Sequence, residues 1–199
     1  RDAADKLSGA RDAAAIIETF TDLRAFDERQ DRPARISPAL GDAVKHLLEE
    51  RARKASAGVS GAELLAEFRD ALEAIRDRVS DWKLDGRGFD ALEAGLEATY
   101  ARLRKRMEKA REEGSAEAFH DWRKDTKYHW HHVTLLEKAA PDVLEYREDL
   151  FDQLGEFLGD HHNLHVLGEV LSNEPGPIDA EDIASVHAVI KEQQVALEQ

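Results

Sequence analysis

Residues 119–133 read FHDWRKDTKYHWHHV, and this stretch decides the fold of the chain. Its mostly apolar positions recur at steps of three and four residues, which is the period of an α-helix and not that of a β-strand. These positions are Phe119, Trp122, Thr126, Trp130 and Val133. The spacing predicts a helix that buries this stripe in a core and turns its charged side chains elsewhere.

The same helical period runs through nearly the whole chain, and Pro, Gly and Ser residues mark where one helix ends and the next begins. Ser37, Ser60 and Ser115 are placed as N-caps, with Ser60 opening a capping box, and Asp179 caps a last helix. We expect helices over residues 1–29, 38–57, 61–80, 89–113, 115–140 and from 141 onward, with an interruption at Gly159. No stretch alternates apolar and polar residues over a length that would indicate a β-strand. The sequence therefore predicts an all-α protein of packed helical hairpins.

A weak internal repeat suggests that these helices form two related halves. The segment Gly9–Ile17 aligns with Gly159–Leu167 at an offset of 150 residues, although a match of nine residues can also arise by chance. We expect one domain over 1–199, divided into a first helical half (1–80), a connecting loop (81–88) and a second half (89–199). The chain begins at Arg1 within a helical pattern, so we expect the first half to lack its N-terminal part.

The overall charge excludes some classes of protein. The formal net charge is -14, which argues against a general nucleic-acid binder because such proteins carry a broad basic surface. The absence of Cys excludes disulfides and thiolate metal sites and is compatible with a reducing compartment, which predicts a cytoplasmic protein. No apolar window is long enough to span a membrane, and no signal-peptide pattern is present.

Positive charge is confined to one region of this acidic chain. Residues 100–131 contain nine Lys and Arg against six Asp and Glu, a local charge of +3, so the remainder carries -17. On the predicted helix, His120, Lys124, Lys127 and His131 follow the spacing of one face, with Arg123 beside them. Such clustered like charges are either ordinary solvated surface or a binding site for an anion. Because they are adjacent and do not alternate with acids, we favour an anion-binding groove.

The preceding helix adds further cations. They are Arg102, Arg104, Lys105, Arg106 and Lys109. The break at Gly114 predicts an antiparallel hairpin, so we expect cations of both helices to face one groove.

The histidines leave a metal site open as an alternative. His161 and His165 are four residues apart, and His129 and His132 are three apart, both of which are spacings found among helix-borne metal ligands. There is no HExxH motif, and no carboxylate stands at a matching position. The histidines could equally bind phosphate oxygens or pack in the core. No nucleophile-and-base motif is present, and we expect a protein without metal, cofactor or catalytic activity.

Three ordered motifs resemble one family. They are Tyr100-Ala-Arg102-Leu-Arg104-Lys105, then His120-Asp-Trp122-Arg123-Lys124-Asp-Thr-Lys127, then the run Leu158–Leu167, LGDHHNLHVL. Together they resemble the second half of the CHAD family, the conserved histidine α-helical domain. Segment 1–29, with Gly9-Ala10-Arg11-Asp12, is similar to the corresponding turn of that family's first half. The sequence departs from the family pattern at Asn163, where an Asp is expected.

The resemblance implies two helical-bundle halves around a basic central cleft or pore that binds inorganic polyphosphate. It also implies association with polyphosphate granules and a fused or associated triphosphate-tunnel domain. Carried over by position, the site would comprise Arg11, Arg104, His120, Arg123, Lys124, Lys127 and His161, with Arg102, Lys105 and His131 as weaker candidates. Two other classes stay open: a metal-dependent phosphohydrolase that uses the histidines, and a helical adaptor whose acidic surface binds basic proteins.

Overall fold

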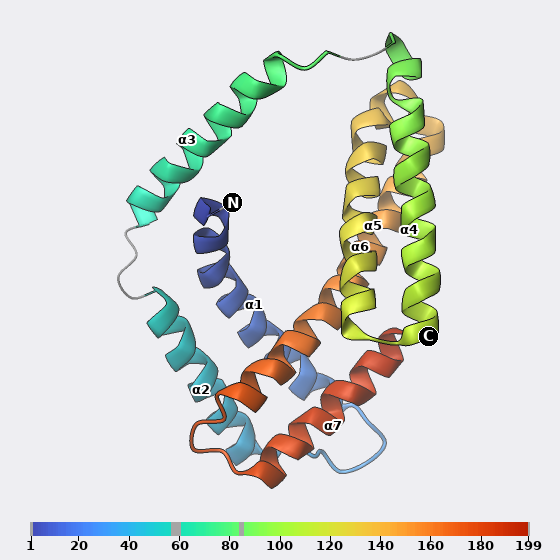
Figure 1. Cartoon of the computed structure of the whole chain (residues 1–199). Helices are drawn as coiled ribbons and strands as arrows, with labels where there is room; N and C mark the ends of the chain where they lie inside the picture. The colour runs from blue at the N-terminus through green and yellow to red at the C-terminus, as the bar shows by residue number, and fades with distance from the viewer. Residues whose placement is uncertain (1, 57–60, 84–85, 199) are drawn as a thin grey trace. The chain divides into compact units, whose positions relative to one another are not determined.

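The computed structural model describes residues 2–56, 61–83 and 86–198, without the side chains of residues 2–11, 56, 61 and 64. Its helices are α1 (Asp2–Glu28), α2 (Pro38–Ser56), α3 (Gly61–Ser80), α4 (Glu93–Glu113), α5 (Ala116–Leu136), α6 (Pro141–Asn173) and α7 (Ala180–Leu197), with short 3₁₀ turns η1 (Gly88–Ala91) and η2 (Glu137–Ala139) (Figure 1). The described residues contain no strand, so the predicted all-α class is confirmed. No helix among them is both long and apolar enough to cross a membrane.

The predicted capping residues start helices where the sequence placed them. The hydroxyl of Ser37 accepts a hydrogen bond from the backbone N–H of Leu40 at 3.2 Å. Ser115 accepts from Ala118 at 3.2 Å, and the carboxylate of Asp179 accepts from Asp182 at 2.8 Å. Each side chain satisfies one of the N–H groups that the first helical turn leaves without a partner. Ser60, the remaining predicted cap, lies outside the described residues.

The predicted interruption at Gly159 is wrong, because α6 continues without a break from Pro141 to Asn173. A single glycine costs an α-helix only about 1 kcal/mol, which packing on either side readily offsets. Leu158 and Leu164 flank it and are both buried. The glycine therefore marks a place where another side chain approaches the helix backbone, which the site described below shows.

A second glycine of α6 offers a test of the helix's intrinsic stability. A methyl group built on Gly155 would meet no atom within 4 Å. Gly155→Ala is therefore expected to raise the free energy of unfolding by about 0.5–1 kcal/mol, because alanine loses less backbone entropy on folding. Gly114→Ala should have the opposite effect, because Gly114 has φ +59° at the end of α4. Urea denaturation of both variants checks this, and destabilisation by Gly155→Ala would contradict it.

The chain folds into two compact units, and the second lies in sequence between the two segments of the first. Unit 1 comprises residues 1–83 and 166–199, and unit 2 comprises residues 84–165. Helix α6 contributes residues to both. The expected division assigned residues 166–199 to the second half, whereas in the structure these residues pack in unit 1. The first boundary falls within the connecting loop that was expected at 81–88.

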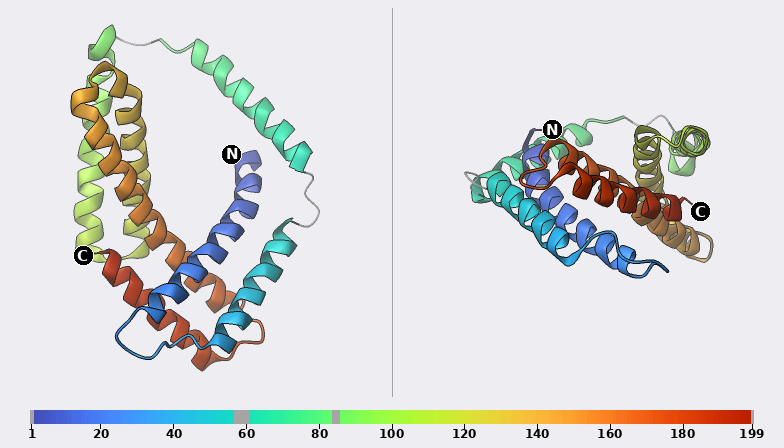
Figure 2. Two further views of the ribbon diagram at one scale, coloured as in Figure 1. Left: turned by 180° about the vertical axis from the view of Figure 1, so that it is seen from behind. Right: turned by 90° about the horizontal axis from the view of Figure 1, so that it is seen from below.

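Unit 1 packs α1, α2, α7 and the last turns of α6 around one core (Figure 2). Its fully buried side chains include Phe20, Leu23, Val44, Leu167 and Val186. Helix α3 belongs to the same unit but exposes much of its apolar stripe, with Leu65 at 61% and Leu72 at 48% exposure. The core of unit 1 therefore lies among the other helices.

One buried carboxylate ties three segments of unit 1 together. Asp27, at the end of α1, has no exposed surface. Its Oδ2 accepts a hydrogen bond from the backbone N–H of Ile36 at 2.8 Å, and its Oδ1 accepts one from Arg32 Nη1 at 2.7 Å. The same Arg32 guanidinium also donates to Glu192 on α7. Asp27 thereby holds the loop between α1 and α2 against the end of α1, and Arg32 connects that loop to α7.

Unit 2 is built on the antiparallel hairpin of α4 and α5, as the break at Gly114 predicted. Ala110 and Ala118 are buried on either side of this turn, where their small side chains let the two helices approach closely. Phe119 and Leu158 join them in one apolar cluster that connects the hairpin to α6. Residues 141–165 of α6 thus cover the side of α5 that carries Arg123 and Lys127.

Candidate functional site

Helix α5 carries two charged faces with different partners. On the face toward α4, Asp125 is 6% exposed and accepts a hydrogen bond from Arg102 Nε at 2.8 Å. Arg106 Nη1 lies 2.9 Å from the Asp121 carboxylate. These pairs connect the two helices of the hairpin. Two of the cations predicted to face a groove therefore bind carboxylates of α5.

The opposite side of α5 borders a groove shared with α6. The groove has a volume of about 530 Å³, and α5 contributes Arg123, Lys127 and Trp130 to its wall. Helix α6 contributes Phe151, Asp152, Gly155, Glu156, Gly159, Asp160 and Asn163. Arg123 and Lys127 are four residues apart, so one face of α5 brings both to the same wall.

Gly159 explains how Arg123 reaches this position. A methyl group added to Gly159 would lie 3.6 Å from Arg123 Nε and 3.7 Å from Nη2. The guanidinium of Arg123 therefore lies against the backbone of α6 at Gly159, where no side chain stands in its way. Gly159, which was predicted to interrupt the helix, instead makes room for Arg123.

The α6 wall of the groove is acidic, which was not predicted from the sequence. Asp152, Glu156 and Asp160 line it and follow each other at four-residue steps. This spacing places the three carboxylates in one row along the helix. The i, i+4, i+8 pattern was readable in the sequence, but it does not by itself show which neighbour the row faces. The groove consequently has one cationic wall and one anionic wall.

Two histidines lie beside the cationic wall. The rings of His120 and His162 are 4.6 Å apart. Burial, together with the positive charges of Lys124 and Arg123, lowers the pKa of His120. Burial also lowers the pKa of His162 to about 4, with further contributions from His120 and Arg123. Both imidazoles are therefore neutral near pH 7, and an anion bound nearby would raise their affinity for protons.

The depressed pKa of His162 makes the stability of the protein depend on pH. Between about pH 6.5 and 4 the unfolded chain binds a proton at this position that the folded chain does not. The contribution of His162 to the free energy of unfolding is fully present above pH 6.5 and is lost as the pH falls. For this half-buried ring the loss is about 2 kcal/mol at pH 4. Urea denaturation between pH 7.5 and 4.5 should show the decline. His162→Gln should flatten it, whereas a curve identical to that of the parent, as expected for exposed His46→Gln, would contradict the assignment.

The other predicted residues lie in several different environments. Arg104, on an exposed part of α4, lies 4.0 Å from Glu108, and Lys105 and His131 are also exposed. Lys124 Nζ lies 2.7 Å from Asp121 Oδ1. His161 is 5% exposed and stacks on Phe119 with ring centroids 4.2 Å apart, so it packs in the core. The side chain of Arg11 lies outside the described residues.

Of the predicted set, the structure thus brings Arg123 and Lys127 together in the groove, with His120 adjacent. It does not bring Arg104 or Lys105 to that groove.

The histidine spacings do not build a metal centre within the described part of the chain. No group of three or more His, Asp or Glu side chains converges there to hold a metal ion. His129 and His132, three residues apart, place their rings edge to face with centroids 6.5 Å apart. His129 instead packs against Tyr100 and Phe151, at 5.1 and 4.7 Å.

The fold and the groove together define an all-helical protein with a cationic helix face set against its neighbour. A family model described as the CHAD domain matches residues 1–172 of the 199-residue chain. The chain therefore belongs to the CHAD family, and the resemblance seen in its three motifs is confirmed. Neither the curated proteins nor the solved structures contain a match.

Proposed function

We propose that this chain binds inorganic polyphosphate along the cationic face of α5 without catalysing a reaction on it. The observation that carries the proposal is the placement of Arg123 and Lys127 on one wall of the groove in a member of the CHAD family. Lys124 is exposed on the same helix, where its Nζ lies 2.7 Å from the Asp121 carboxylate. A linear polyanion lying along this face would meet these cations in succession.

The chemistry of each group suits phosphate. A guanidinium presents its N–H donors in a planar fork that matches two phosphate oxygens, and a lysine ammonium supplies a mobile point charge. His120 and His162 are neutral without a ligand, and a nearby phosphate chain would favour their protonation. Binding is then expected to take up protons at pH values above about 4, the pKa of His162 without a ligand.

The acidic row of α6 limits how the polymer can lie. Asp152, Glu156 and Asp160 repel an anion, so a phosphate chain should follow the α5 wall and keep away from the groove's far side. The row also lowers the affinity expected for the site. Repulsion of this kind can restrict the ligand to a narrow path along the cations.

A direct titration tests the proposed binding. Polyphosphate should bind with an affinity that falls steeply as salt rises, because each neutralised phosphate releases a counterion. Fluorescence anisotropy with end-labelled polyphosphate at 50 to 300 mM NaCl measures the slope. Poly-glutamate of similar length should bind much more weakly, because its carboxylates are spaced differently along the chain. Equal binding of both polymers, or no salt dependence, would contradict the proposal.

The alternative of a metal-dependent phosphohydrolase has a separate test. It needs converging metal ligands, and the described residues offer no such group. Incubation of the protein with polyphosphate and Mg²⁺ or Mn²⁺, followed by measurement of released phosphate, distinguishes the two functions. Under the binding proposal no phosphate appears above the buffer control.

We further propose that the protein acts at polyphosphate granules in the cytoplasm, alongside a triphosphate-tunnel domain.

A further inference from the structure

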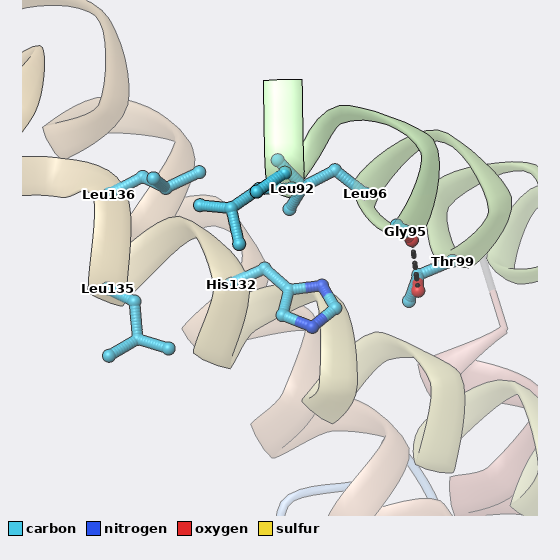
Figure 3. A pocket seen from close by; sticks show the side chains of 8 residues that line it. Leu92, Gly95, Leu96, Thr99, His132, Leu135 and Leu136 are labelled. Atoms are coloured by element: carbon cyan, nitrogen blue, oxygen red, sulfur yellow. Dashed lines mark hydrogen bonds between the residues drawn. The ribbon is translucent and has the colours of Figure 1, made fainter. Parts of the chain in front are cut away.

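Unit 2 contains two adjoining apolar cavities that the phosphate groove does not use. One, of about 290 Å³, lies between the start of α4 and the end of α5 (Figure 3). The other, of about 310 Å³, extends toward the start of α6. Leu96, His132 and Leu136 line both cavities, so the two adjoin and are considered together as one site. Its size is within the range of pockets that bind small organic molecules.

The polar side chains that the described residues contribute to this site are few, and none of them is acidic. The hydroxyl of Thr99 already donates to the carbonyl of Gly95 at 2.8 Å, as the dashed line in Figure 3 shows. The remaining polar side chains are His129, His132 and Arg147. Among the described residues, no Asp or Glu lines either cavity, although the chain carries 42 of them. The site is therefore apolar, with two histidines and one arginine as its remaining polar lining.

The two imidazoles restrict which ring nitrogen is available. His129 is 9% exposed, and its Nδ1 is buried with no hydrogen-bond partner; Nδ1 of His132 is likewise buried and without a partner. A buried N–H without an acceptor is rarer in proteins than an under-satisfied acceptor. The neutral rings are therefore expected to keep Nδ1 unprotonated and to carry their proton on Nε2. Burial, with a further contribution from the charge of Arg147, lowers the pKa of His129, which keeps this ring neutral.

These features select the chemistry of a ligand. Leucine and alanine side chains favour an apolar body, while Nε2–H groups and a guanidinium both donate hydrogen bonds. A single carboxylate can accept from both types of donor at once, whereas a polyphosphate chain would have to leave most of its charges in an apolar cavity. We propose that the paired cavities bind a small monocarboxylate with an apolar body, such as a medium-chain fatty acid, with its carboxylate directed to Arg147 and His129.

Decanoate and decanol form a matched pair of probes for this site. Isothermal titration of the full chain should show decanoate binding at least tenfold more tightly than decanol, because only decanoate has the carboxylate. Arg147→Gln should reduce decanoate affinity about tenfold and leave decanol unchanged. Arg104→Gln, an exposed arginine of α4 outside the cavities, should affect neither ligand.

The tautomer provides a second, independent readout. Long-range ¹H–¹⁵N spectra of the parent protein should show His129 and His132 protonated at Nε2, and decanoate should shift the Nε2 resonance of His129. Leu136→Trp, which fills part of both cavities, should abolish binding of both probes if its circular dichroism spectrum matches that of the parent. Equal affinity for decanoate and decanol, an unaffected Arg147→Gln variant, or Nδ1 protonation would each overturn the proposal.

Discussion

Arg123→Gln is expected to weaken polyphosphate binding by about tenfold to a hundredfold. Arg123 is the cation that lies against the backbone of α6 in the groove, and glutamine cannot supply its charge or its paired donors. Hydrogen bonds to charged groups contribute about 1.5–3 kcal/mol each, which corresponds to this range. The slope of affinity against salt concentration should also fall by about one phosphate contact. Anisotropy titration at several NaCl concentrations measures both effects.

Two matched variants make this result specific. Glu156→Gln removes one charge from the opposite wall of the same groove and should strengthen binding. Arg111→Gln removes an exposed cation at the end of α4, outside the groove, and should change affinity less than threefold. A loss for Arg111→Gln equal to that for Arg123→Gln would mean that net charge alone controls binding. The groove would then have no special role.

Asp27→Ala is expected to lower the free energy of unfolding by about 3–5 kcal/mol. The substitution removes the acceptor of the Ile36 N–H and the partner of Arg32, and it does so where no water reaches. Arg32 would retain Glu192 and the carbonyl of Pro33 as partners. Urea denaturation followed by circular dichroism measures the change, and a shifted midpoint with an unchanged slope would place the effect on the folded state.

Asp22→Ala provides the control on the same helix. Asp22 is exposed, so this change should alter stability by no more than about 0.5 kcal/mol. Asp27→Asn keeps an oxygen for the Ile36 N–H and should be less damaging than Asp27→Ala. If the alanine and asparagine variants behave alike and both match Asp22→Ala, the buried carboxylate does not hold unit 1 together.

The helices and most of their ends were predictable because their signals are local. Ser37, Ser115 and Asp179 each act within three residues of their own position, and the apolar stripe of α5 follows from its period. Gly159 was misinterpreted because sequence cannot show what lies against a glycine. Gly114 has open space around it and ends a helix, whereas Gly159 lies within a helix and a guanidinium packs against its backbone.

The site was predictable on one side only. The phase of α5, which depends on a single helix, predicted a face of His120, Lys124, Lys127 and His131 with Arg123 beside it. Of these residues, Arg123 and Lys127 line the groove, whereas Lys124 pairs with Asp121. The ion-pair partners of Arg102 and Arg106 could also have been predicted from the sequence. Asp125 follows the α4–α5 turn by about as many residues as Arg102 precedes it, and the same holds for Asp121 and Arg106. The acidic wall could not be foreseen, because it depends on how α6 is rotated against α5.

The division of unit 1 into two chain segments has a consequence for synthesis on the ribosome. Asp27 and Arg32 emerge first, while Glu192 follows only after all of unit 2 has been made. Unit 2 is one uninterrupted segment, so its hairpin and the covering turns of α6 can associate as soon as they leave the exit tunnel. The nascent chain is therefore expected to complete its middle before its beginning, with α1 and α2 waiting for α7.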